Sequence, residues 1–207
     1  MPISRTTRQQ LILAVTVVLI SLFHAKFRVV ERTPGDDTWD EVSRDGVRAM
    51  NDQRYDQAEA LFQRALAISR AESSWRRATS LQNLGKVRFL RGEFAEAKPL
   101  FREAITMLES HHPDPAHLAV VLNDLAMTHA NQGAFDEALP TIERAVRLDD
   151  RSDAAPREVI RRLRNYSAVL LANGRPADAS AAAARATAME SANPVTAGRP
   201  TSKQSPK

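Results

Sequence analysis

The sequence of 207 residues contains no cysteine and few aromatic residues. Without cysteine, disulfides, thiolate catalysis and cysteine-ligated zinc are excluded. Phe, Trp and Tyr make up only 5% of the chain, although 43% of its residues are hydrophobic. Val and Ile gather near the N-terminus, and the remainder is rich in Ala, Leu, Arg and Glu. This composition favours helices, because Ala and straight-chain residues lose little conformational freedom in them.

Motifs for enzymatic chemistry are also missing. We find no glycine-rich phosphate loop, nucleophile elbow or paired-carboxylate arrangement, so we predict a protein that is not an enzyme and needs no cofactor. One cluster has side chains that could bind zinc or copper: His111, His112, Asp114 and His117. The same segment is also an ordinary inter-helix loop, because Pro113 ends one helix and Pro115 begins the next. We therefore expect no metal site.

Positive charge is concentrated at the two ends of the chain. The net charge is +4 overall, with +4 in residues 1–35, +3 in residues 195–207 and hence −3 in residues 36–194. A nucleic-acid-binding protein is expected to carry its basic excess on the folded surface that meets phosphate. We therefore expect no nucleic-acid partner. The composition of residues 195–207 predicts a disordered basic tail.

An apolar run, LILAVTVVLISLF, extends from Leu11 to Phe23 after a basic segment, residues 1–10. We interpret residues 11–25 as a transmembrane signal-anchor of a single-pass membrane protein, followed by a polar stalk, residues 26–37. A cleaved signal peptide is the alternative, although Phe23, two positions before Ala25, does not suit signal peptidase. The run is short for a bilayer, which asks for about 20 residues. Basic residues flank both sides of the run, so the charge pattern leaves both orientations open; we favour the one in which the remainder of the chain lies outside the cytoplasm.

Four similar segments follow, beginning at Tyr55, Phe94, Phe135 and Pro176. Each follows a shorter helical stretch and a turn, and a glycine occupies the turn in the last three. Alanine recurs at two places in these segments: Ala58, Ala97, Ala138 and Ala179, then Ala65, Ala104, Ala145 and Ala186. A bulkier residue recurs between them: Phe62, Phe101, Ile142 and, as an exception, Ala183. The preceding stretch carries a column of small residues: Gly46, Gly85, Ala126 and Ser167. Small residues at fixed spacing let antiparallel helices approach closely.

This pattern resembles the tetratricopeptide repeat (TPR) family, whose helix pairs follow W-x2-L-G-x2-Y, then A-x3-F, then P. Its spacing of 39 to 41 residues exceeds the usual 34, and is most similar to the longer repeats of kinesin light chains. The resemblance implies an all-α, right-handed superhelical solenoid of four antiparallel helix pairs over residues 38–194. The expected repeats span about 38–71, 78–111, 119–152 and 160–193.

The resemblance also implies a concave groove, lined by the first helix of each repeat, that binds a protein or peptide. Asparagine in the position two before the small column commonly meets ligand backbone in the longer repeats, and an amide both donates and accepts hydrogen bonds. The alternative is that these polar residues merely face water. The expected groove residues are Arg44, Asn83, Lys86, Asn123, Asp124, Met127, Asn131, Arg164 and Asn165.

Two functions follow from these expectations. The leading one is a membrane-anchored scaffold that binds an extended partner segment in its groove. The alternative is a homo-oligomeric, self-assembling structural subunit of an envelope complex, stacked through its fourth repeat. Asn165, Tyr166 and Ser167 match a glycosylation sequon, but they fall within an expected helix and we discount it.

Overall fold

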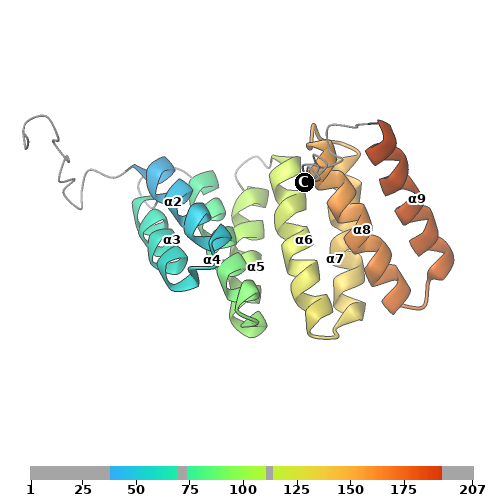
Figure 1. Cartoon of the computed structure of the whole chain (residues 1–207), viewed down its shortest axis with the longest axis horizontal. Helices are drawn as coiled ribbons and strands as arrows, with labels where there is room; N and C mark the ends of the chain where they lie inside the picture. Colours follow the sequence, from blue (N-terminus) through green and yellow to red (C-terminus); the bar gives the residue numbers. More distant parts are fainter. Residues whose placement is uncertain (1–37, 70–73, 111–113, 193–207) are drawn as a thin grey trace, which may run out of the picture. The chain divides into compact units, whose positions relative to one another are not determined.

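The computed structural model describes residues 38–69, 74–110 and 114–192, which form eight α-helices (Figure 1). They are α2 (Trp39–Asn51), α3 (Tyr55–Ser69), α4 (Ser74–Leu90), α5 (Phe94–Ser110), α6 (Pro115–Asn131), α7 (Phe135–Asp149), α8 (Pro156–Ala172) and α9 (Pro176–Ala192). The expected signal-anchor, stalk and basic tail lie outside these residues. Within the described ranges, every helix falls short of the length and hydropathy that a membrane span requires.

The helices pack as four antiparallel pairs, as the sequence predicts: α2 with α3, α4 with α5, α6 with α7, and α8 with α9. We call the two members of each pair the first and the second helix of repeats 1 to 4. The second helices begin at the four residues that the sequence alignment indicates. The first helices α4, α6 and α8 begin four residues before the expected repeat starts. This additional turn also packs, since Leu118 and Val159 are buried in it.

Contacts between repeats are unequal on the two sides of the domain. Each second helix packs against the first helix of the next repeat, and consecutive first helices also contact one another. Within the described ranges, no comparable contact joins consecutive second helices. Consequently the second helices are joined mainly through the first helices that lie between them.

A residue in the left-handed backbone conformation follows the first helices, as the glycine pattern predicts. Gly92, Gly133 and Gly174 have φ angles of +79°, +74° and +70°. This conformation costs an L-residue energy that glycine avoids. In repeat 1 the equivalent turn contains Gln53, with a φ of 60°. Proline occupies the first position of α6 and α8, where its missing N–H has no helical partner to lose.

The recurring alanines and the bulky residue between them form the centre of repeats 1 to 3. Phe62 and Phe101 are fully buried, and a Cβ added to Gly46 or Gly85 would stand 2.6 or 2.7 Å from a ring carbon. In repeat 3 the small position holds Ala126, which is larger than glycine, and the bulky position holds Ile142, which is smaller than phenylalanine. Both lie in one buried cluster. The small column and the bulky column therefore compensate one another in volume, which keeps the helix spacing similar at interior packing density.

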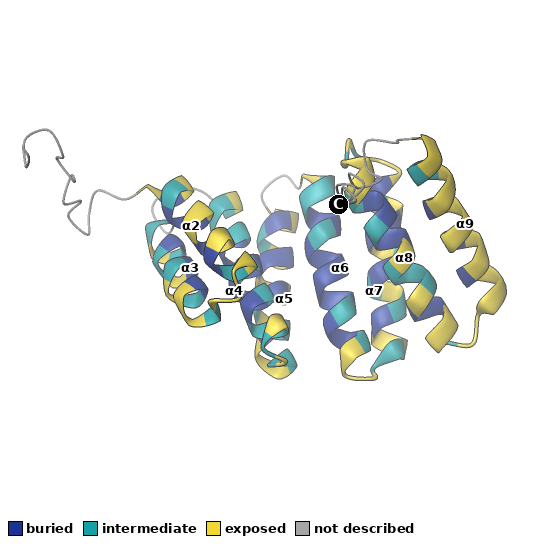
Figure 2. Ribbon diagram, viewed as in Figure 1, coloured by how far each residue is buried: buried dark blue, intermediate teal, exposed yellow. Residues whose placement is uncertain are grey.

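The last helix, α9, differs from the other second helices on its outward side, which Figure 2 shows as largely exposed. In α7, Leu139, Ile142 and Val146 pack in clusters with residues of α8. In α9 the residues 41 positions later are small or polar and exposed: Ser180, Ala183 and Thr187. Because these side chains bury little apolar area, α9 suits the end of a solenoid better than a stacking surface.

Candidate partner-binding site

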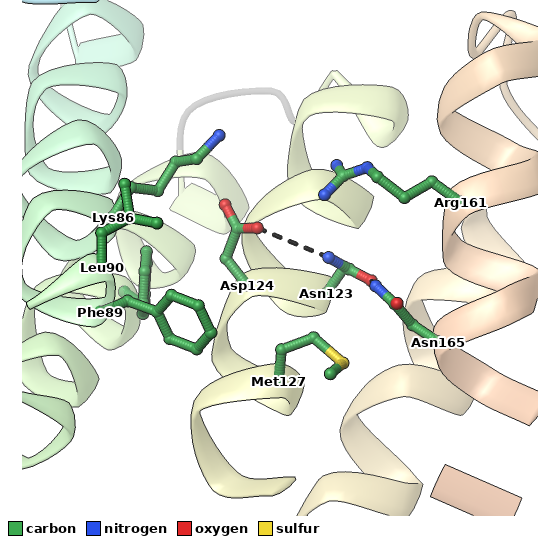
Figure 3. Close-up of a pocket in the computed structure, with 9 residues that line it drawn as sticks. Lys86, Phe89, Leu90, Asn123, Asp124, Met127, Arg161 and Asn165 are labelled. Atoms are coloured by element: carbon green, nitrogen blue, oxygen red, sulfur yellow. Dashed lines mark hydrogen bonds between the residues drawn. The ribbon is translucent and has the colours of Figure 1, made fainter. Parts of the chain in front are cut away.

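A cavity of about 340 Å³ lies among the first helices of repeats 2, 3 and 4, with Phe101 of α5 also at its wall (Figure 3). Its lining contains five of the nine residues expected from the sequence: Lys86, Asn123, Asp124, Met127 and Asn165. They come from α4, α6 and α8, so three repeats build one site. This arrangement requires the regular spacing of first helices described above.

The other four expected residues lie outside the cavity lining. Arg44 is exposed on α2, and Asn83 is half-buried on α4. Asn131, at the end of α6, donates its side-chain N–H to the Met127 carbonyl oxygen over 2.8 Å. Arg164 is exposed and forms an ion pair with Glu190 of α9 at 2.6 Å.

Three further residues line the cavity although the sequence analysis did not single them out: Phe89, Leu90 and Arg161. Leu90 is 46% exposed, which is unusual for leucine in this chain. Phe89 and Leu90 follow Lys86 by three and four positions, so all three project from one side of α4. That spacing is the signal that could have identified them.

Hydrogen bonds between first helices run along the floor of this site. The Gln82 amide donates to an Asp124 carboxylate oxygen over 2.9 Å, and the Asn165 amide donates to the Asn123 side-chain oxygen over 2.8 Å. Gln82 and Asp124 precede Asn123 and Asn165 by 41 residues, so one contact recurs in successive repeats. We call this pair of contacts the inter-repeat ladder. In repeat 1 the equivalent position holds Ser43, whose buried hydroxyl has no hydrogen-bond partner among the described residues.

The ladder changes the interpretation of these polar positions. Asn123 is 1% exposed and Asp124 is 9% exposed, so they face a neighbouring helix more than solvent. The sequence pattern predicts that they bond to a partner's backbone or face water. In the structure, Asp124 accepts a hydrogen bond from Gln82 and Asn123 accepts one from Asn165. These contacts form because residues two and three before the small column lie where consecutive first helices meet.

His117 extends the ladder at its repeat-3 end, where its Nε2 lies 3.0 Å from the Gln82 side-chain oxygen. Burial lowers the pKa of His117, and the nearby Asp114 and Asp124 carboxylates oppose this shift only in part. Asp114 caps α6 by accepting a hydrogen bond from the Ala116 N–H. Two members of the histidine-rich cluster therefore have structural partners, and His111 and His112 lie outside the described residues. Within those residues, no group of three metal-ligating side chains occurs.

The rim of the cavity is cationic. Figure 3 shows Lys86 of α4 and Arg161 of α8 reaching toward it from opposite sides of Asp124. Lys86 has no ion pair within the part of the chain that the structure describes, whereas Arg161 pairs with Glu158 at 2.6 Å. Burial opposes ionisation of Glu158, but the hydrogen bond from Arg161 and the charges of Arg161, Arg162 and Lys86 together outweigh it, and the pKa of Glu158 is lowered. Beneath the cations, Phe89, Leu90 and Met127 supply apolar surface.

A scan against known families matches residues 46–196 to the MalT-like TPR region. The chain belongs to this family. The match covers most of the sequence and all four helix pairs except the start of α2. It confirms the tetratricopeptide resemblance, and such repeat scaffolds are typically not enzymes. No curated protein matches the sequence.

Solved structures show the same fold at low sequence identity. BtubC (BKLC) from P. vanneervenii is 22% identical with a TM-score of 0.68, covering 98% of this chain and 81% of that one. TPR-like repeats of a putative kinesin light chain from Podosopora anserina are 17% identical with a TM-score of 0.59, covering 84% and 83%. MamA from Desulfovibrio magneticus RS-1 is 13% identical with a TM-score of 0.57, covering 76% and 78%.

Proposed function

We propose that this MalT-like TPR protein is a membrane-anchored scaffold that binds an extended segment of a partner protein in the groove of its first helices. The observation that carries this proposal is the cavity built by three successive repeats. A segment that crosses α4, α6 and α8 would contact one first helix per repeat, in the way that a solenoid surface is commonly used.

The chemistry of the cavity favours a segment with an acidic residue beside an apolar one. Lys86 offers an unpaired cation and Arg161 a half-exposed one, and a carboxylate placed between them would bond to both. Phe89, Leu90 and Met127 would cover the adjacent apolar side chain. Because both cations are solvent-accessible, affinity for the partner should fall as salt is added.

The membrane attachment rests on the apolar run of residues 11–25 in the sequence. We infer that this segment anchors the chain as a single-pass protein and that the repeats lie outside the cytoplasm. Full-length chain should then remain in the membrane pellet through carbonate and high-salt washes, because its attachment is apolar. A mature protein that begins near Phe27 would show instead that the segment is a cleaved signal.

A site-specific photo-crosslinker tests the groove in native membranes. Placed at Leu90, it should attach to one discrete partner, and the added Lys86→Glu change should reduce that product strongly. Leu171 is the matched control, since it is a leucine in the last turn of another first helix, 58% exposed and outside the cavity lining. Equal products from both positions would place the binding site elsewhere.

Self-assembly stays the alternative prediction, and α9 gives it little support. The outward positions of this helix are Ser180, Ala183 and Thr187, which offer a second copy almost no apolar area. Light scattering on the detergent-solubilised full-length chain separates the two functions. A mass that rises with concentration in the absence of any partner would favour the structural subunit over the scaffold.

A further inference from the structure

A second cleft, of about 480 Å³, lies between the second helices α5 and α7. We call it the second-helix cleft. Its floor comes from α6, where Leu122 and Leu125 are 3% and 6% exposed, and Ile105 of α5 adds a third apolar side chain. None of the residues that line the first-helix cavity lines this cleft.

The cleft is open because one side chain on its α7 wall is short. Thr141 lines it, and the residue 41 positions earlier in α5 is Leu100, which packs against the cores of repeats 1 and 2. A leucine in place of Thr141 would reach further across the floor. In the following repeat, Tyr166 stands 41 positions after Leu125 and donates its hydroxyl to Glu143 over 3.4 Å. The space between α5 and α7 therefore combines an aliphatic floor with a short wall residue, whereas the preceding repeat has Leu100 at the wall position and the following repeat has Tyr166 at a floor position.

Unpaired positive charge lines the α5 wall. Arg102 borders the cleft and Lys98 precedes it by one helical turn. Neither forms an ion pair with any residue in the described ranges, whereas Arg144 on the opposite wall is paired with Glu109. The positions equivalent to Arg102 in the neighbouring repeats hold Gln63 and Glu143. The cation at this point is thus not a general feature of the repeats.

His129 lies on α6 beyond the residues that form the floor. It follows Leu122 and Leu125 at helical spacing, so all three share one face of α6. His129 is 5% exposed, its Nδ1 has no hydrogen-bond partner among the described residues, and the nearest carboxylate oxygen, on Glu137 of α7, is 3.7 Å away. Burial lowers the pKa of His129, Glu137 opposes this, and Lys98 and Arg102 of α5 add to it.

We propose that the second-helix cleft docks an acidic, amphipathic segment of a second protein partner. Leucine-like side chains of that segment would cover the floor formed by Ile105, Leu122 and Leu125. Its carboxylates would pair with Lys98 and Arg102, which is charge complementarity that the chain itself leaves unsatisfied. The solenoid then holds one partner on its first helices and another on its second helices.

The test uses two dye-labelled dodecapeptides, one of Glu-Glu-Leu-Leu units and one of Lys-Lys-Leu-Leu units, against full-length chain in phosphatidylcholine nanodiscs. The acidic peptide should bind, shift the methyl NMR signals of the three floor residues and raise the pKa of His129 toward its ordinary value. The basic peptide should do none of this. Lys98→Glu combined with Arg102→Glu should weaken binding at least tenfold.

Two matched variants locate the effect. Arg147→Glu changes an exposed cation of α7 that does not line the cleft, and should alter affinity less than twofold. The acidic peptide also suits the first-helix cavity, so Lys86→Glu can lower its total binding but should leave the shifts of the three floor methyl signals unchanged. The proposal is overturned if neither peptide binds, if the Lys98 and Arg102 reversals have no effect, or if Lys86→Glu abolishes the shifts of the floor methyl signals. Binding to phosphatidylglycerol vesicles in preference to the acidic peptide would assign the cations to lipid instead.

Discussion

Two junctions between repeats use the same positions with opposite chemistry. Where α5 meets α6, Leu108 and Val121 are buried in one apolar cluster. The residues 41 positions later, where α7 meets α8, are Asp149 and Arg162, which are equally buried. Arg162 donates its Nε–H to an Asp149 carboxylate oxygen over 2.8 Å, and its Nη2 bonds to the other oxygen.

The comparison shows that helix geometry at a junction does not dictate the chemistry that fills it. Leu108 and Val121 each stabilise the fold by leaving water, and each does so without the other. Asp149 and Arg162 depend on one another, because two desolvated charges are tolerated only as a well-bonded pair. The Arg162 Nη1 is buried with no partner among the described residues, which adds a further cost. We therefore expect the junction of repeats 3 and 4 to open before that of repeats 2 and 3.

The largest expected effect comes from a position that is equivalent, and equally buried, in repeats 2 and 3. Ala138 is fully buried in α7, as Ala97 is in α5. Ala138→Glu should unfold repeat 3, because overpacking costs about 1–3 kcal/mol and an unpaired buried carboxylate adds several more. Thermal melting followed by circular dichroism measures the loss of helix.

The control for this change is the neighbouring Glu137→Ala. The Glu137 side chain is 63% exposed, so its removal should shift the melting temperature little. Equal melting temperatures for the two variants would mean that the alanine column does not pack as described.

The ion pair itself should produce the next largest effect. Asp149→Ala leaves the Arg162 guanidinium buried without its carboxylate, and breaking a buried pair in this way costs about 3–5 kcal/mol. The loss should be concentrated in repeat 4. Hydrogen exchange should therefore accelerate in α8 and α9 while α4 and α5 keep their protection.

Copying the other junction should repair this defect. Asp149→Leu combined with Arg162→Val reproduces Leu108 and Val121, and replacing a buried pair with apolar residues is often neutral or stabilising by about 1–4 kcal/mol. If the double variant is as unstable as Asp149→Ala, the two junctions differ in backbone spacing and not only in side-chain chemistry.

The two junctions also show what the sequence can reveal. The alanine, glycine and bulky columns recur every 39 to 41 residues, so they predict the helix pairs, the left-handed turns and the second-helix starts. Asp149 and Arg162 break the recurrence instead of following it. A pattern search therefore gives no reason to place them in the interior, where only the pairing of one with the other allows them.

The candidate site illustrates the same limit. Spacing predicts that Lys86, Asn123, Asp124, Met127 and Asn165 lie on first helices, and the structure brings these five residues together. Spacing cannot predict that Asp124 and Asn165 bond to neighbouring repeats, because these bonds depend on the distance between two helices that are 41 residues apart in the chain. Nor does spacing reveal that Arg44, Asn83 and Arg164 fall outside the cavity.

A smaller effect should separate ladder residues from groove residues. Asp124→Ala removes the acceptor of the Gln82 amide from a buried site, and hydrogen bonds to charged groups contribute about 1.5–3 kcal/mol. Asn83→Ala, at the equivalent place in repeat 2, should cost well under 1 kcal/mol, since Ser43 makes no bond to it. Urea denaturation measures both. Equal stabilities would return Asp124 to the role that the sequence analysis gave it, as a reader of partner backbone.

The smallest expected effect is the pH dependence of the ladder. His117 adjoins the contact between repeats 2 and 3. The equivalent residue of repeat 4, 41 positions later, is Glu158, which bonds to Arg161. The pKa of His117 is lowered in the folded chain, mainly by burial, so the unfolded chain binds its proton more readily. The stability that neutral His117 supports is complete above the ordinary histidine pKa of about 6.5 and is lost as the pH falls toward its folded value. One proton limits the slope to about 1.4 kcal/mol per pH unit. Glu158, whose pKa is also lowered, loses its contribution only in more acidic solution.

Unfolding free energies at pH 7.5 and 5.5 should therefore differ less in His117→Gln than in the unchanged chain, because glutamine keeps a polar group beside Gln82 but does not titrate. His129→Gln removes the second buried histidine and should reduce the difference independently. A His117→Gln variant that retains the whole pH dependence would show that His117 is not held neutral at the junction of repeats 2 and 3.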